Sequence, residues 1–280
     1  MRKIFLLIAI AAFVSVTSLH AQDVVYDKNK PRIEGSGNIV TKTVNVQPFD
    51  QIDLSGIFSL KLSQGAKEEV KIEADDNLQD LFEVKNEGSK LTITMKKESN
   101  FNSKKKLKVY ITFKKLKSMD LKTVGDVSSE ESLSFDDVKI GNKSVGSVDL
   151  KLTAQSVNID NKSVGDVKLN GKADNAVIRN NSVGSIRAAD FVVQKMDINN
   201  DGIGSAEVNA EKEIKVKDSF LGRVSNKGAA TIKRTKKVVI CFQNEKSRLD
   251  PKFLNFLMCM LIVQILRAGR LLYIDKLSLL

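Results

Sequence analysis

A glycine-centred motif recurs along the middle of the chain and constrains its fold more than any other feature. Its six copies, such as Ser-Val-Gly-Asp at 163–166, place glycines 21, 19, 19, 20 and 18 residues apart, at Gly125, Gly146, Gly165, Gly184, Gly204 and Gly222. A sequence period in this range indicates a repeat architecture in which similar units stack on one another. Each motif therefore predicts one turn of a stacked protein.

Between the glycines, apolar residues occupy every second position. Val167 and Leu169, for example, flank the polar Lys168. A period of two puts alternate side chains on opposite faces of a β-strand. We therefore predict an all-β chain, with a β-helix or β-solenoid of about six short coils over residues 118–235, stacked ~4.8 Å apart. An N-terminal β region over residues 36–117 precedes it.

A column of amide side chains lies four residues before the glycines, at Asn142, Asn161, Asn180 and Asn200, and continues to Asp218. In register, these amides would form a ladder at a corner, each bonding to the coils above and below. The alternative is that asparagine only tolerates a tight turn. We favour the ladder. The glycines are interpreted as structural, because they permit a left-handed or closely approached backbone, and none precedes a phosphate-binding helix.

The residue before each glycine is aliphatic, at Val124, Val145, Val164, Val183, Ile203 and Leu221. Strict alternation would turn all six outward as a stripe ~24 Å long. Alternatively, each glycine breaks the alternation with a bulge, so that these side chains enter the core and Ser144, Ser163 and Ser182 face outward. We expect the core arrangement, because an uncovered aliphatic stripe invites aggregation.

The two ends of the chain differ from its body. Residues 1–21 have a basic start, an apolar stretch and a small residue before the expected cut after Ala21, which is typical of a signal peptide. An uncleaved anchor is the alternative, but the stretch falls short of the ~20 residues that span a bilayer. A linker is expected over residues 22–35. The apolar tail over residues 236–280 is atypical, and we consider a cap, an interfacial segment or a shifted reading frame; no membrane span is expected in the mature body.

Composition excludes several chemistries. The formal net charge of +11 leaves +6 on residues 22–240, a mild excess that does not indicate nucleic-acid binding. The single histidine, His20, would be removed with the signal peptide, so we expect no catalysis by imidazole in the mature protein. Cys241 and Cys259 both lie in the tail, so neither a disulfide framework nor a zinc site is expected in the body.

Residues 46–65, 70–78 and 90–94 carry a resemblance to a known family. The order of a phenylalanine-to-glycine stretch, the segment EADDNL and a following LTI strand resembles the domain family labelled "putative autotransporter adhesin, head GIN domain", over roughly residues 36–235. The resemblance implies an exported all-β protein with a β-helical part, from Bacteroidetes-like cell envelopes. Valine at 145 and 164, where such proteins often carry a small turn residue, and the ending after residue 240 depart from the family.

Two sets of oxygen-bearing side chains are candidates for a site. Asp126 and Asp166 share a column two coils apart, about 10 Å, close to the ~6.5–9.5 Å of an inverting glycosidase pair. Ser147 lies between them and the chain has no tryptophan, so a solvated row of turn residues is favoured. Asp197, Asn199, Asn200 and Asp201 could hold calcium, but their spacing suits an ordinary turn better. No metal and no cofactor are expected.

A basic patch is the remaining candidate for binding. It comprises Lys104, Lys105, Lys106 and Lys108, with Tyr110 on the outward parity of the strand Lys108–Lys114. Such a patch could attract a polyanion such as an anionic glycan. Lysines on an outer strand also guard against edge-to-edge aggregation, and we favour the guard role.

The sequence as a whole favours an exported, non-catalytic binding or adhesion protein of the bacterial cell envelope. Its place would be the periplasm, the outer-membrane surface or the extracellular space. An envelope glycan or an envelope protein is the partner class we expect, and nothing in the sequence chooses between them. The alternative is a polysaccharide lyase or hydrolase built on a β-helix.

Overall fold

A computed structural model describes residues 32–96, 100–219 and 221–234. The chain divides into two compact units, Met1–Lys236 and Lys237–Leu280, and every described residue belongs to the first. The expected signal peptide, most of the linker and all of the atypical tail, with Cys241 and Cys259, lie outside the described residues.

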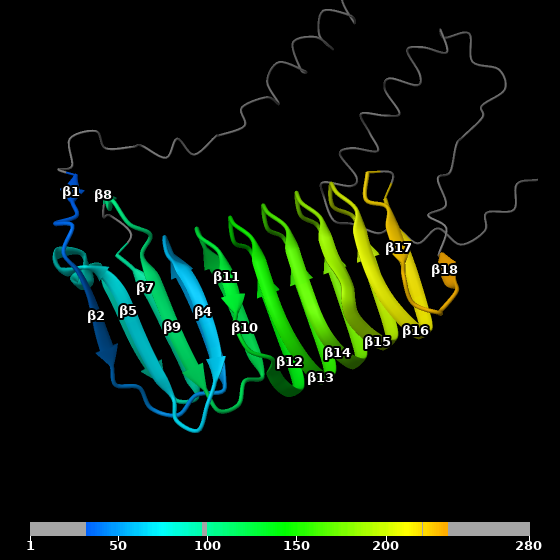
Figure 1. Cartoon of the computed structure of the whole chain (residues 1–280), viewed down its shortest axis with the longest axis horizontal. Helices are drawn as coiled ribbons and strands as arrows, with labels where there is room; N and C mark the ends of the chain where they lie inside the picture. Colours follow the sequence, from blue (N-terminus) through cyan, green and yellow to red (C-terminus); the bar gives the residue numbers. More distant parts are fainter. Residues whose placement is uncertain (1–31, 97–99, 220, 235–280) are drawn as a thin grey trace, which may run out of the picture. The chain divides into compact units, whose positions relative to one another are not determined.

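The described unit is almost entirely β-structure, as predicted, and most of its strands join one extended sheet (Figure 1). Its one helical element among these residues is the short 3-10 helix η1 (Asp76–Leu81). The strands are β1 (Ile33–Glu34), β2 (Ile39–Val44), β3 (Gln51–Gly56), β4 (Ser59–Gln64), β5 (Glu69–Asp75), β6 (Phe82–Glu87), β7 (Lys90–Met95), β8 (Phe101–Asn102), β9 (Lys108–Phe113), β10 (Ser118–Thr123), β11 (Val127–Ser129), β12 (Leu133–Asn142), β13 (Val148–Asn161), β14 (Val167–Asn180), β15 (Ile186–Asn200), β16 (Ala206–Asp218), β17 (Val224–Asn226) and β18 (Ile232–Arg234).

The long strands β12 to β16 form the predicted solenoid. Each pairs in parallel with the next, and β13 and β14 match residue for residue from Val148↔Val167 to Asn161↔Asn180. Each strand bends around one coil, and a five-residue corner then leads to the next strand. Corresponding residues therefore stack in columns along the solenoid.

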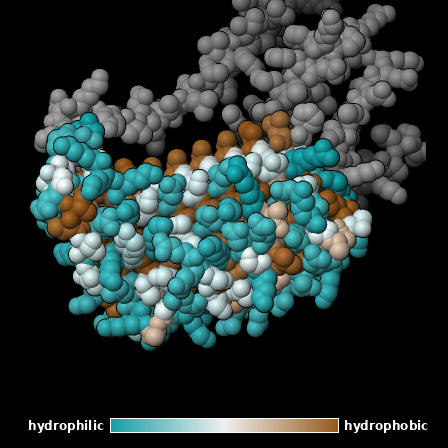
Figure 2. All heavy atoms as spheres, in the orientation of Figure 1, coloured by the Kyte–Doolittle hydropathy of each residue, from teal (hydrophilic) through white to brown (hydrophobic). Residues whose placement is uncertain are grey.

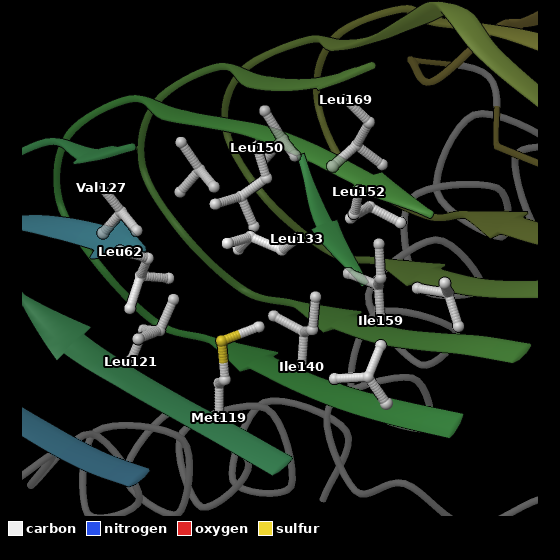
Figure 3. Packing of buried hydrophobic residues seen from close by; sticks show 14 of the residues in the cluster. Leu62, Met119, Leu121, Val127, Leu133, Ile140, Leu150, Leu152, Ile159 and Leu169 are labelled. Atoms are coloured by element: carbon white, nitrogen blue, oxygen red, sulfur yellow. The ribbon is translucent and has the colours of Figure 1, made fainter. Parts of the chain in front are cut away.

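The interior is filled by the inward members of the alternating pattern. Figure 3 shows Leu150 and Leu169 on one side of the interior, facing Ile140 and Ile159 on the other. All four are buried. Burial of one such apolar face on every coil is the main stabilising term of the fold.

Small irregularities in the repeat spacing are absorbed within the strands, not at the corners. The pairing of β14 with β15 slips by one residue between Lys168 and Gly171, and that of β15 with β16 shifts twice after Ala188. These bulges take up the 20- and 18-residue spacings, so the corners remain in register.

The N-terminal β region continues the same stack. β3 pairs in parallel with β10 and β4 with β11, whereas β5 runs antiparallel to both of its neighbours, β2 and β9. The rings of Phe58 and Phe82 approach to 5.8 Å between centroids beside η1. No helix among the described residues is long and apolar enough to cross a membrane.

Candidate functional site

The corner that follows each long strand is the most regular feature of the surface. At the corner between β13 and β14, Asn161 and Ser163 are buried, Val164 is exposed and Val167 is buried again. The corner therefore reverses the usual arrangement, with polar side chains inside and an aliphatic one outside.

The glycines keep these corners stacked. Gly165 has a φ angle of +138°, which side chains rarely adopt, and a Cβ there would lie 2.2 Å from the carbonyl oxygen of Gly146. The same conformation recurs at Gly125, Gly146, Gly184 and Gly204. The sixth repeat glycine, Gly222, departs from this, because its N–H turns back to the Ser219 carbonyl in the last described corner.

The predicted asparagine ladder is confirmed. Asn142 Nδ2 donates to Asn161 Oδ1 at 2.8 Å, Asn161 to Asn180 at 2.7 Å and Asn180 to Asn200 at 2.6 Å. Each amide oxygen in the first three coils also accepts a hydrogen bond from the serine hydroxyl two residues later. The ladder therefore pairs the polar groups that the corner buries.

The ladder stops at both ends where the sequence changes. Asn200 donates to the Gly204 carbonyl, and the next residue in the column, Asp218, pairs with Arg234 at 3.3 Å. At the other end, Leu121 takes the asparagine position, and the buried hydroxyl of Thr123 has no hydrogen-bond partner.

The aliphatic column faces outward, so the predicted core placement is wrong. Val124, Val145, Val164, Val183, Ile203 and Leu221 are 49–61% exposed, and Ile57 beside Val124 is 52% exposed. Ser144, Ser163 and Ser182, expected to face outward in that arrangement, are buried. The reason is that glycine holds the inward position between Ser163 and Val167, so the alternation is not broken and Val164 must face out.

These seven residues, Ile57, Val124, Val145, Val164, Val183, Ile203 and Leu221, are called the aliphatic ridge below. Parallel bridges join its members from Val124 to Ile203 in successive coils. Figure 2 shows a row of apolar residues along the edge where the corners lie, beside a largely polar face.

The backbone of the ridge is hydrogen-bonded between coils. The N–H of Val145 donates to Thr123 at 2.9 Å, and the N–H of Gly146 donates to Val164 at 2.9 Å. Equivalent bonds repeat at Val164, Gly165, Val183, Gly184 and Ile203. The ridge can therefore lose water to a partner without leaving these amides unpaired.

Two polar columns flank the ridge. The lysine column, two residues before it, comprises Lys122, Lys143, Lys162, Asn181, Asp201 and Ser219; the aspartate column, two residues after it, comprises Asp126, Ser147, Asp166, Ser185, Ser205 and Arg223. Asp126 accepts a hydrogen bond from the Ser147 N–H at 3.1 Å and pairs with Lys106 at 3.2 Å. These interactions, the Ser147 N–H first, hold the pKa of Asp126 below its usual value.

The carboxylates considered for glycan hydrolysis are held by the corners. Asp166 accepts from the Ser185 N–H at 2.9 Å and pairs with Arg187 at 2.7 Å, just as Asp126 binds Ser147 and Lys106. Each is thus tied to the next coil. The lowered pKa of Asp126 is opposite to what a general acid needs.

The oxygen-rich set considered for calcium is divided by the alternation of β15. Asn200 is buried in the ladder, whereas Asp197 and Asp201 are exposed on the outer side. No group of three or more acidic, histidine or cysteine residues within the described ranges is arranged to hold a metal ion.

The basic patch is split between two acidic partners. Lys108 Nζ and Tyr110 Oη both contact the Glu73 carboxylate, at 2.8 and 2.9 Å, while Lys106 reaches Asp126; Lys104 and Lys105 are exposed. The hydrogen bond from Lys108 lowers the pKa of Glu73, and burial raises that of Tyr110. Strand β9 is paired on both sides, by β5 and β4, so Lys108 does not guard a sheet edge.

Sequence reasoning missed a groove of about 920 Å³ on another face. It lies between the segment that follows β9 and the outer faces of β12 to β14, and Lys115, Lys117, Lys139, Asp136 and Asn158 are among its lining residues. Lys117 is paired with Asp50 at 2.6 Å and Lys115 with Asp136 at 3.8 Å. Contacts between segments so far apart in sequence leave no local signal.

The chain has clear relatives of known structure. Residues 48–230 match the domain family described as "Putative auto-transporter adhesin, head GIN domain". The crystal structure of a putative adhesin from Bacteroides fragilis is 31% identical, with a TM-score of 0.63, over 72% of this chain and 100% of that one. That of a putative lipid binding protein from Parabacteroides distasonis is 20% identical, with a TM-score of 0.52, over 74% of this chain and 100% of that one, and shares the fold. No curated protein matches significantly. The chain therefore belongs to the head GIN domain family of putative auto-transporter adhesins, as its sequence indicated.

Proposed function

We propose that the chain is an exported, non-catalytic binding protein of the bacterial envelope, and that the aliphatic ridge is its contact surface. The observation that carries the proposal is the row of seven aliphatic side chains, each about half exposed, on consecutive coils. Contiguous exposed apolar surface on a soluble protein marks interaction sites.

The construction of the ridge suits this role. Its side chains stand on a backbone fixed by hydrogen bonds between coils, and valine and isoleucine lose little side-chain freedom on binding. A partner therefore meets a surface that is already ordered, which lowers the entropic cost of association.

The family supports binding as the activity. The two solved relatives named above, from Bacteroides fragilis and Parabacteroides distasonis, are described as a putative adhesin and a putative lipid binding protein. The basic, apolar and small-residue order of residues 1–21 supports export. Glycan hydrolysis is disfavoured, because Asp126 and Asp166 are each engaged with a neighbouring coil.

An adhesion assay on the full chain tests the proposal. The purified protein is immobilised, and the binding of intact bacterial cells is compared between the wild type and the double variant Val145→Thr/Val164→Thr. Threonine has nearly the shape of valine and replaces one methyl by a hydroxyl. We expect cell binding to fall at least about fivefold, in keeping with the loss of central apolar contacts.

The matched control is Val177→Thr/Val192→Thr, which changes two valines that are partly exposed on the strand faces, away from the ridge. This variant should bind as the wild type does. Equal binding by the ridge and control variants would contradict the proposed surface. Export is tested separately by fractionating cells that produce the tagged chain, and a cytoplasmic, uncleaved product would contradict it.

A further inference from the structure

We infer that the partner of the ridge is a second copy of this chain, docked ridge to ridge with the two solenoids parallel and related by a two-fold axis along the stack. The inference rests on the proposed function, because it identifies the partner of the same surface. Three properties of the ridge carry it: its repeat, the charges beside it and its size.

The repeat makes the ridge complementary to itself. Each coil contributes one aliphatic side chain, and consecutive coils lie ~4.8 Å apart, so a parallel copy presents the same spacing. A two-fold axis along the stack places Val124, Val164 and every other member opposite its own equivalent. The result is an isologous contact, which closes as a dimer.

The flanking charges favour this pairing. Rotation about an axis along the stack brings the lysine column of one copy opposite the aspartate column of the other, coil by coil. Lys122 then faces Asp126, and Lys162 faces Asp166. The remaining opposed pairs each contain at least one uncharged residue, namely Lys143 with Ser147, Asn181 with Ser185, Asp201 with Ser205 and Ser219 with Arg223. Within the two columns no like charges are opposed. In the single chain Lys122 and Lys162 pair with Asp53 and Asp160, at 3.0 and 3.1 Å, and the two aspartates pair with Lys106 and Arg187. Docking therefore exchanges these pairs for pairs between copies, which fixes the register more than it adds affinity.

The size of the surface sets the strength of the contact. Seven ridge positions span about 29 Å, and the two columns lie about 13 Å apart along the chain, which gives a footprint of roughly 400 Å² per copy. This is below the ~800 Å² per partner of a standard interface. The dimer is therefore weak in dilute solution and becomes strong where many copies are arrayed on a surface.

A lipid surface fits the ridge less well. Interfacial anchors combine Trp, Phe or Leu with a polar face rich in Lys and Arg. The ridge has mostly short valines, and Asp126 and Asp166 lie two residues from it. The aspartate column would repel an anionic membrane while the lysine column attracts it, so the two flanks give such a surface no clear electrostatic preference.

Cysteine cross-linking of the full chain tests the arrangement. In a Cys241→Ser/Cys259→Ser background, Val124→Cys and Val164→Cys are each oxidised mildly, with Val177→Cys as the off-ridge control. Parallel docking predicts a disulfide-linked dimer for both ridge variants and none above background for the control. Because Val124 lies near one end of the ridge, an antiparallel pair would hold its two copies far apart. Cross-linking through position 164 without 124 would overturn the parallel arrangement.

Charge exchange provides an independent readout without cysteine. Lys162→Glu should weaken self-association about tenfold in sedimentation experiments, because it faces Asp166 of the second copy. Adding Asp166→Lys should restore it. Failure of the exchange to restore dimers would overturn the proposed register.

Two further outcomes separate this inference from the proposed function. If ridge variants lose cell binding but the wild type stays monomeric at every concentration and fails to cross-link, the second copy is wrong and the ridge still binds another partner. If the monomer instead co-sediments with phosphatidylethanolamine–phosphatidylglycerol vesicles, and Val145→Thr/Val164→Thr abolishes this, the partner is a lipid surface and the second copy is again overturned.

Discussion

The two sides of each corner obey opposite rules. On the inner side, Asn161 and Ser163 are buried; the Asn161 side chain bonds to the coils on both sides, and the Ser163 hydroxyl donates to Asn161. On the outer side, Val164 is half exposed and is joined to the neighbouring coils through its backbone alone. Polarity is thus inside and apolarity outside, within three residues. The inner side stabilises the stack, and the outer side is free to contact a partner.

The difference shows that backbone geometry, and not hydropathy, decides which residue is buried at this corner. Strand alternation fixes which side each residue faces, and glycine occupies the last inward position of the corner without a side chain. A buried amide is then tolerable because every coil supplies the partner for the next. Four predictions test this division, from the largest expected effect to the smallest.

Replacing the glycine should disrupt both sides of the corner. Gly165→Ala introduces a Cβ 2.2 Å from the Gly146 carbonyl oxygen at a φ of +138°. We expect a loss of about 3 kcal/mol or more in the free energy of unfolding, measured by urea denaturation. Gly88→Ala is the control, since that glycine also has a positive φ, +57°, but no atom lies within 4 Å of its added Cβ. A loss no greater than that of the control would show that close stacking does not limit the corner.

Removing a ladder asparagine should lower the free energy of unfolding by less than the glycine substitution does. The loss should arise from groups in more than one coil. Asn161→Ala leaves the Asn142 amide and the Ser163 hydroxyl without an acceptor, for which we expect about 2–3 kcal/mol. Because Ser163→Ala removes one of those stranded groups, the double variant should lose less than the sum of the two single variants. Strict additivity of the measured unfolding free energies would contradict a connected ladder.

A charge on the ridge should leave the fold nearly intact. Val183 is 51% exposed, so Val183→Asp should change the free energy of unfolding by less than about 1 kcal/mol. The same substitution at the buried Val167 should cost several times more. Thermal melts of both variants, side by side, separate the two positions. A large loss at Val183 would mean that the outer side also stabilises the stack.

Counting in steps of two predicted the coils and the ladder, because strand alternation is a local rule that sequence displays directly. The same count predicted an outward Val164, and the expectation that an uncovered aliphatic stripe invites aggregation wrongly overrode it. The structure keeps the alternation because glycine occupies the inward position at 165, where a Cβ would lie 2.2 Å from the Gly146 carbonyl oxygen.

Other parts of the site could not be found in this way. Ile57 extends the ridge from outside the repeat, and it reaches Val124 only because β3 pairs with β10. Glu73 accepts hydrogen bonds from Lys108 and Tyr110 because β5 and β9 pair in antiparallel register. Both depend on pairings between distant segments, for which a single sequence contains no marker.

The smallest expected effect is a pH dependence of stability, which should be present in the aspartate column beside the ridge and absent from the ladder. The Ser147 N–H and Lys106 lower the pKa of Asp126, so its contribution to stability is complete above the unfolded-state value of ~3.9 and is lost as pH falls through the lower folded-state value. Asp126→Asn should therefore destabilise the protein at neutral pH and make no difference in strong acid. Since the side chain is 53% exposed, solvent screening limits the effect to roughly a few tenths of a kcal/mol. The ladder residues have no titratable group, so the cost of Asn161→Ala should be the same at both pH values. Unfolding curves at pH 7 and in acid check both statements. A pH-dependent loss of unfolding free energy for Asn161→Ala would show that the ladder and the aspartate column are coupled.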